Sequence, residues 1–413
     1  MRIPMLFRFS LYGFLKNQQY YDPFLILIFL EKGLSYFLIG ILIAFREICV
    51  NIFEIPSGAV ADLYGRRRAM ILSFAAYIVS FVVFALSRSI VLLFCAMFFF
   101  AIGEAFRTGT HKAMIFNWLQ IEGRSDEKTK TYGYTRSWSK MGSALSVLIA
   151  SGLVFYTGDY SKVFLFCIIP YMVGIINFLG YPAALDGDTD VCVSLRAVAV
   201  FLWSALKQAA RYRSLRRLII ESMGFEGMFK VSKDYFQPIL KQTALALPLF
   251  LTLADKKRTA LLIGVVNFVL YILSSIASRH SHRLAEWKDG EDRAARFIWV
   301  IDWMIYASLI PLLWFRLNYV VIVFFVFLAI MQNFWRPLLI SRINAHSTPE
   351  MGATVLSIES QAKSFATMLI APVLGWLVDI TGAFWPVGVF GAVIATLIVI
   401  TARPLEDVQI TQS

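Results

Sequence analysis

Long apolar runs constrain this chain more than any other feature of its sequence. Twelve stretches each hold about 20 mostly hydrophobic residues, the length that an α-helix needs to cross the hydrocarbon core of a bilayer. Only 16% of the 413 residues are charged, whereas a soluble domain carries about 25%. The sequence therefore predicts an all-α integral membrane protein with spans near 9–30, 34–57, 67–87, 90–115, 132–157, 161–183, 215–240, 257–278, 294–315, 318–340, 353–379 and 384–402.

The longest polar interval between spans divides them into two sets of six. We expect an N-terminal half, a linker, a C-terminal half and a tail, at 1–183, 184–214, 215–404 and 405–413. Lys and Arg gather in the segments on one side of the spans, which predicts that both termini are cytoplasmic. One loop, which contains the cluster Lys256-Lys257-Arg258, does not follow this distribution because its basic residues lie on the opposite side. Residues 195–210 of the linker have the composition of a helix that lies along the membrane surface.

The net charge of +12 belongs to a membrane protein rather than to a nucleic-acid-binding one. Cytoplasmic loops collect basic residues, and anionic lipid headgroups attract them. The cysteines lie singly, at Cys49, Cys95, Cys167 and Cys192, so the sequence predicts neither a disulfide framework nor a metal site. The polar first span lacks a small-residue cleavage site, and we expect no cleavable signal peptide.

A spaced motif lies between the second and third spans. Gly58, Asp62 and Gly65 fall at G-x-x-x-D-x-x-G spacing, and Arg66 and Arg67 follow directly. The first glycine permits close helix approach, the aspartate can cap the third span, and Gly65 supplies a tight or left-handed turn. The arginines hold the loop at the cytoplasmic face. This pattern resembles the same loop of major facilitator superfamily (MFS) transporters.

The resemblance implies an MFS fold, with twelve transmembrane helices in two pseudo-symmetric halves that work by alternating access. It also implies structural or gating roles for Glu54, Gly58, Asp62, Gly65, Arg66 and Arg67. Gly375, Asp379 and Gly382 repeat the spacing near the end of span eleven without the arginines. There we expect close helix packing followed by a glycine stop.

Ionisable residues inside spans are the candidates for function, because each costs about 2.5–3.5 kcal/mol at the helix centre unless it is paired or hydrated. Spans one, four, seven and ten line the cavity of MFS proteins. The resemblance therefore implies a cavity lined by Gln18, Asp22, Arg107, His111, Lys230, Asp234, Gln237, Asn333 and Arg336. Arg136 and Lys140 of span five join it if their helix face turns inward.

Several of these charges have a local alternative to ligand binding. Three pairs of opposite charge are spaced three or four residues apart, so that each pair shares a helix face on which an ion pair can form. They are Glu104 with Arg107, Glu226 with Lys230, and Glu359 with Lys363. Asp22 and Asp302 have no such neighbour. We therefore expect these two carboxyl groups, rather than the others, to carry protons during transport.

The function that the sequence favours is secondary transport of a small organic solute, anionic or zwitterionic, with proton coupling. The alternatives are a proton-driven exporter of drugs or amphipathic compounds and a non-transporting receptor or scaffold on the same fold. The chain has no phosphate-binding G-x-x-x-x-G-K-[ST] loop, and its four histidines form no catalytic motif. We expect no enzyme activity and no cofactor. The protein is predicted to be a multi-pass monomer of the inner or plasma membrane, with the lipid bilayer, protons and its solute as partners.

Overall fold

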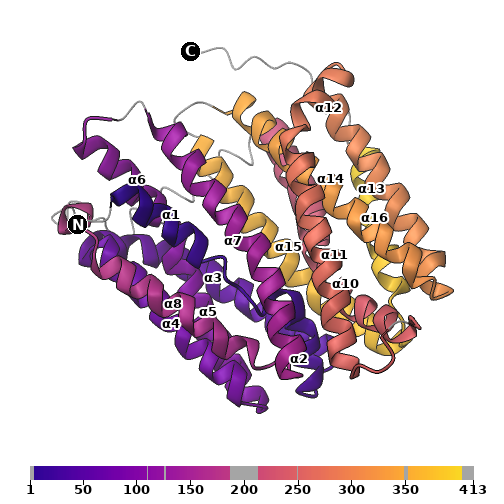
Figure 1. Cartoon of the computed structure of the whole chain (residues 1–413). Helices are drawn as coiled ribbons and strands as arrows, with labels where there is room; N and C mark the ends of the chain where they lie inside the picture. Colours follow the sequence, from indigo (N-terminus) through magenta and orange to yellow (C-terminus); the bar gives the residue numbers. More distant parts are fainter. Residues whose placement is uncertain are drawn as a thin grey trace. The chain divides into compact units, whose positions relative to one another are not determined.

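The computed structural model describes residues 4–108, 110–124, 127–186, 213–248, 250–347 and 352–401. Within these ranges the chain is helical and contains no strand (Figure 1). The predicted surface helix at 195–210 and the predicted tail at 405–413 lie outside the described residues.

The helices follow the predicted spans closely. The first part of the chain forms α1 (Met5–Leu15), the 3-10 turn η1 (Asp22–Phe24), α2 (Leu25–Glu31), α3 (Tyr36–Tyr64), α4 (Arg66–Leu86), α5 (Ile90–Arg107), α6 (Thr110–Ile121), α7 (Lys128–Thr157), α8 (Val163–Leu179) and η3 (Ala183–Leu185). The second part forms α10 (Arg213–Ala246), α11 (Asp255–Arg279), α12 (Ser281–Trp287), α13 (Glu291–Trp314), α14 (Asn318–Ala345), α15 (Gly352–Thr381) and α16 (Trp385–Thr401). Each predicted span overlaps one of these helices or two in succession.

Hydropathy supports a multi-pass membrane protein. In the described part of the chain, eight helical segments are long and apolar enough to cross a membrane, and α1, α8 and α16 are shorter apolar helices. The helix α10 does not qualify because charged residues such as Glu226, Lys230 and Asp234 interrupt it. The number of twelve crossings stays a prediction.

The chain divides into two compact units. Unit 1 comprises 1–33, 45–199 and 248–268, and unit 2 comprises 34–44, 200–247 and 269–413. The helices α3 and α11 are thus each split between units, so the units share most residues with the predicted halves without being identical to them. In unit 1, α4 packs on α5 and α8, and α1 packs on α7. In unit 2, α13 packs on α14 and α16, and α10 packs on α14 and α15.

Aromatic rings fill the centre of each unit. In unit 1, Tyr171 lies 4.8 Å from Phe74 and 4.9 Å from Phe81, centroid to centroid. In unit 2, Phe225 stacks on Trp335 at 4.9 Å and Trp299 meets Phe225 edge-on at 5.3 Å. Lipid tails are as apolar as these rings, so close packing rather than removal from water holds such a core together in a membrane.

The first predicted span is not one helix. Sequence analysis predicted a continuous span over 9–30, but α1 ends at Leu15 and helix resumes only at η1 and α2. The polar residues between them explain the break, because their side chains satisfy carbonyls that a continuing helix would have used. Asn17 Nδ2 donates to the Gly13 carbonyl at 2.7 Å, and Gln18 Nε2 donates to the Phe14 carbonyl at 3.3 Å. Gln18 Nε2 also reaches the Gly142 carbonyl of α7 at 3.1 Å.

The second copy of the glycine–aspartate spacing acts as predicted, within unit 2. A Cβ on Gly375 would overlap the backbone of Tyr36, so this glycine permits close approach of α15 to α3. Gly382 ends α15 with a φ of +60°, a left-handed conformation. The structure adds a role for Asp379, whose carboxylate accepts the N–H groups of Tyr36 and Phe37 at 3.0 and 2.8 Å. It caps the first turn of α3 from another helix.

Candidate functional site

A polar pocket of about 500 Å³ lies within unit 1, where α1, α5, α6 and α7 meet. Its lining includes five cationic side chains and one histidine: Lys16, Arg107, Lys112, Arg136, Lys140 and His111. Among the described residues no carboxylate lines it. The pocket is therefore a concentration of positive charge among helices of unit 1, and we call it the cationic pocket.

Two interrupted helices create the pocket. Lys16 and Asn17 line it directly after α1 ends, and Arg107 and Thr108 line it where α5 ends. Thr108 has an extended backbone with ψ of 127°, and α6 begins at Thr110. Irregular backbone at membrane depth is tolerated where it lines a cavity, and many transporters bind solute at such breaks.

The end of α5 corrects one expectation. Arg107 and His111 were predicted one turn apart on a single helix, but they belong to α5 and α6. The predicted ion pair of Glu104 with Arg107 is also absent from the described residues. Arg107 instead donates from Nε to the hydroxyl of Tyr77 at 3.4 Å. Because a tyrosine hydroxyl is neutral, this contact orients the guanidinium without neutralising it, and the carboxylate of Glu104 lies within electrostatic range of Arg107.

Aromatic groups form the wall behind the cations. His111 is 7% exposed and stacks on Tyr12 at 3.8 Å between ring centroids. Its Nε2 lies 3.3 Å from the hydroxyl of Tyr181. Lys112 lies over the ring of Tyr132 at 5.4 Å, and Lys16 lies over the ring of Tyr12 at 5.4 Å. These cation–π contacts hold the ammonium groups in place without neutralising them.

The helix α7 supplies the opposite wall. Arg136 and Lys140 are one turn apart and both line the pocket, so their face of α7 turns inward. Thr135, Ser139 and Ser143 add hydroxyl groups to the same wall. Close packing fixes α7 against α1, since a Cβ on Gly142 would lie 2.6 Å from the carbonyl oxygen of Phe14.

The remaining predicted cavity residues are not in this pocket. Gln18 is 2% exposed and bonded to backbone, as described above. Asp22 is half-buried at the first position of η1. Five others belong to unit 2, on α10 and α14: Lys230, Asp234, Gln237, Asn333 and Arg336. Their role as cavity residues stays a prediction.

Unit 2 holds buried charges of another kind. Arg336 on α14 binds Glu359 on α15 with two bonds, at 2.7 and 3.1 Å, and Glu359 is fully buried. The hydroxyl of Ser222 donates to the same carboxylate. Sequence analysis had assigned Glu359 to Lys363 on its own helix, but the bidentate arginine is the closer partner. Glu226 accepts bonds from Gln332 at 3.3 and 3.4 Å.

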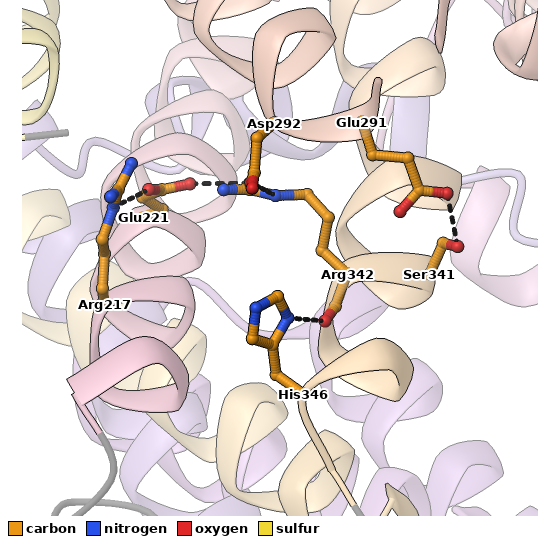
Figure 2. A network of polar contacts seen from close by, with 7 residues as sticks. All are labelled: Arg217, Glu221, Glu291, Asp292, Ser341, Arg342 and His346. Atoms are coloured by element: carbon orange, nitrogen blue, oxygen red, sulfur yellow. Dashed lines mark hydrogen bonds and ion pairs between the residues drawn. The ribbon is translucent and has the colours of Figure 1, made fainter. Parts of the chain in front are cut away.

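A second ion network joins α10, α13 and α14 (Figure 2). Arg342 is 2% exposed and donates to Glu221 at 2.8 Å and to Asp292 at 2.7 Å. Arg217 donates to the other oxygen of Glu221 at 2.8 Å, and Ser341 donates to Glu291 at 2.6 Å. Sequence analysis did not single out Arg342. The acidic first turn of α13 opposite a basic last turn of α14 was the available signal.

The buried carboxyl group of Asp302 belongs to neither of these ion networks. It lies near the middle of α13 and is 5% exposed. Among the described residues it forms no ion pair, and the hydroxyl of Tyr306 is an electrostatic neighbour. A carboxyl group buried without a cationic partner is costly, which marks Asp302 as a candidate for function.

The motif loop in unit 1 is organised by an aspartate that sequence analysis did not assign. Gly65 has a φ of +95°, which confirms the predicted turn. The carboxylate of Asp186, which follows η3, accepts the backbone N–H of Arg67 at 2.7 Å and lies 3.8 Å from its guanidinium. It caps the first turn of α4, the role predicted for Asp62. The side chain of Asp62 lies outside the described residues.

Two other motif predictions have different outcomes. Gly58 is exposed and a Cβ there would meet none of the described atoms within 4 Å, so no close helix approach at this glycine is seen within unit 1 and its role stays a prediction. Arg66 donates its backbone N–H to the Asp186 carbonyl at 3.4 Å, and Glu54 is half-buried in α3.

The discordant basic cluster lies in the first turn of α11 rather than in a loop, and it is locally compensated in unit 1. Lys256 pairs with Glu31 at 2.9 Å and lies over the ring of Tyr160 at 5.4 Å. Lys257 lies over the ring of Phe155 at 5.4 Å. These contacts give the cluster a structural role, which the positive-inside rule does not consider.

Comparison with known proteins decides the family. The family model of the Major Facilitator Superfamily matches residues 17–359, most of the chain. The chain belongs to the major facilitator superfamily. This family assignment argues against an enzyme. A curated relative, the uncharacterized MFS-type transporter YxaM of Bacillus subtilis (strain 168), is 24% identical over 226 residues. That match spans 53% of this chain and 54% of YxaM, about half the length of each.

Solved structures confirm the MFS fold. The nucleoside transporter NupG is 12% identical, with a TM-score of 0.75 over 97% of this chain and 98% of that one. A POT family transporter in complex with 5-aminolevulinic acid is 14% identical, with a TM-score of 0.68 over 96% and 94%. A D-xylose-proton symporter is 13% identical, with a TM-score of 0.65 over 95% and 96%. At these identities the likeness concerns the fold alone.

Proposed function

We propose that this MFS protein is a secondary active transporter of a small organic anion or zwitterion, whose negative group binds in the cationic pocket. One observation carries the proposal: five cationic side chains line a cavity of about 500 Å³ that contains no carboxylate among the described residues. An anion that enters gains several charge-assisted hydrogen bonds at once.

The cost of buried charge supports this proposal. Removing a charge from water costs several kcal/mol, and the cost is offset only by a partner of opposite charge or by water. In unit 2 that partner is part of the protein, as Glu359 is for Arg336. The described lining of the cationic pocket contains no carboxylate, and Glu104 lies within electrostatic range of Arg107 from outside the lining. An anionic solute is therefore the natural partner of the pocket cations.

Gating is assigned to the motif loop. Alternating access needs an interface that forms in one state and breaks in the other. The proposed gating residues are Glu54, Gly58, Asp62, Gly65, Arg66 and Arg67. Asp186 is added to them as the group that fixes the loop.

The basic loops favour cytoplasmic termini in an inner or plasma membrane, and we propose that the protein is a monomer.

Proton coupling is assigned to Asp302 first and to Asp22 second. Asp302 is buried and lacks an ion pair in the described part of the chain, so its protonation depends on access to water rather than on a fixed cation. Asp22 stands next to the break in the first span. If Asp302→Asn abolishes pH-driven accumulation in liposomes and keeps solute binding, the assignment holds. Accumulation at the wild-type level in Asp302→Asn and in Asp22→Asn would exclude both residues.

A thermal-shift screen of purified protein tests the proposed function. A ligand of the native state raises the melting temperature Tm by mass action. We expect organic anions to raise Tm in the wild type and in Arg88→Gln, which removes an exposed cation of unit 1 outside the pocket. The effect should disappear in Arg136→Gln. Stabilisation by lipophilic cations alone, unchanged in Arg136→Gln, would instead support the exporter.

A further inference from the structure

The cationic pocket holds more positive charge than one negative charge can balance. Its five cationic side chains enter from three parts of the chain: Lys16 after α1, Arg107 and Lys112 around the α5–α6 break, and Arg136 and Lys140 from α7. None of the five forms an ion pair within the described residues. A monoanion would leave most of this charge uncompensated.

The cations also repel one another. Lys16 lies within electrostatic range of Arg107 and of Arg136, and Arg136 lies within range of Lys140. Aromatic rings and hydroxyls hold these groups together despite the repulsion, as described for Tyr12, Tyr77 and Tyr132. The repulsion is relieved most by a ligand that places negative charge near several of them at once.

The donor geometry favours flat or tetrahedral oxyanions. Two guanidinium groups, Arg107 and Arg136, lie on different helices, and each can bind a carboxylate or phosphate with two parallel bonds. The hydroxyls of Thr108, Ser139 and Ser143 also line the pocket, and each donates to a backbone carbonyl four residues earlier. The aromatic side chains Tyr12 and Tyr132 leave an apolar surface for the carbon skeleton of a solute.

We infer that the cationic pocket selects an organic solute with two or more negative charges, a phosphate monoester or a dicarboxylate, over its singly charged analogue. This inference rests on the proposed function and sharpens its substrate class. The headgroup of an anionic lipid offers the same phosphate chemistry, and the experiment below separates the two sources.

The experiment measures Tm shifts and dissociation constants with matched pairs of probes. The pairs are succinate with monomethyl succinate and phenyl phosphate with methyl phenyl phosphate, and inorganic pyrophosphate reports on charge alone. We expect each dianion to bind about tenfold more tightly than its monoanionic partner, a difference of about 1.4 kcal/mol. The preference should be lost in Arg107→Gln and Arg136→Gln and retained in Arg88→Gln.

Each outcome separates the two proposals. Equal affinity for the two members of both pairs, with binding still lost in Arg136→Gln, overturns the inference and leaves the anion transporter standing. No stabilisation by any anion overturns both. The measurement is repeated in phosphatidylcholine nanodiscs with and without phosphatidylglycerol. Stabilisation by phosphatidylglycerol alone, lost in Arg136→Gln and accompanied by no dianion effect, assigns the pocket to a lipid headgroup and also overturns the inference.

Discussion

The charges of the cationic pocket in unit 1 and the charges on α14 in unit 2 are arranged in opposite ways. In unit 2 the two arginines of α14 each meet carboxylates of other helices, Arg336 at Glu359 and Arg342 at Glu221 and Asp292. In unit 1 the five cations of the pocket meet aromatic rings, hydroxyls and one another. Charge that the protein neutralises internally holds helices together. Charge that it concentrates without neutralising is available to a ligand, and the comparison therefore separates scaffold from binding site.

The largest effect is expected from breaking the buried network of unit 2. Arg342→Gln leaves Glu221 without one of its cations and Asp292 without its partner, and removing one member of a buried pair costs about 3–5 kcal/mol. We expect a large fall in Tm in detergent. The matched control is Arg293→Gln, which breaks an exposed pair with Asp289. Equal falls in Tm for the two variants would contradict the structural role of Arg342.

The pocket arginine should show the reverse behaviour. Arg136→Gln removes one of several repelling charges, so Tm without ligand should stay the same or rise. Loss of a charge-assisted bond costs about 1.5–3 kcal/mol, so anion affinity should fall by about tenfold to a hundredfold. Titration calorimetry with pyrophosphate measures the affinity. A variant that unfolds as readily as Arg342→Gln would place Arg136 in the scaffold instead.

A smaller effect is expected at the cap of α4. Asp186→Asn keeps the size of the side chain and weakens its bond to the Arg67 N–H, and losses of helix caps cost about 0.5–2 kcal/mol. Tm should fall modestly and anion binding should not change, since Asp186 does not line the pocket. A change in affinity without a change in Tm would connect the motif loop to the pocket rather than to α4.

The smallest effect belongs to the exposed pair of Arg124 and Glu127. Hydrogen bonding from Arg124 lowers the pKa of Glu127 below its ordinary value. A lowered folded-state pKa gives a contribution that is present at neutral pH and is lost as the pH falls through that value. Because the pair is exposed and screened by salt, its contribution to stability is small. Glu127→Gln should therefore change Tm less than any variant above, and a large acid-dependent difference from wild type would contradict this.

The sequence predicts helix positions well, because the length of each apolar run determines where a membrane-spanning helix lies. The break after Leu15 was harder to place, since the polar run from Lys16 to Gln19 is also compatible with a helix that faces a cavity. The polar run packs against α7, where the Gly142 carbonyl accepts a hydrogen bond from the Gln18 side chain. Sequence patterns within one span do not contain that partner.

The candidate site was predictable only in part, because sequence patterns within one helix do not contain the partners on other helices. Arg136 and Lys140 could be proposed from their one-turn spacing, although the direction of their helix face could not. Pairs between helices were missed: Asp186 caps a helix 119 residues away, and Glu359 binds Arg336 rather than the neighbour four residues along. Local spacing predicts contacts on one helix, whereas packing between helices decides which partner is closer.

The most direct test of the anion site is a pair of pyrophosphate titrations, on wild-type protein and on Arg136→Gln, with Tm recorded at each concentration. The cationic pocket predicts a concentration-dependent rise of Tm in the wild type and little or none in the variant, whose Tm without ligand matches or exceeds that of the wild type. Identical titration curves would show that the uncompensated cations of unit 1 do not form the binding site.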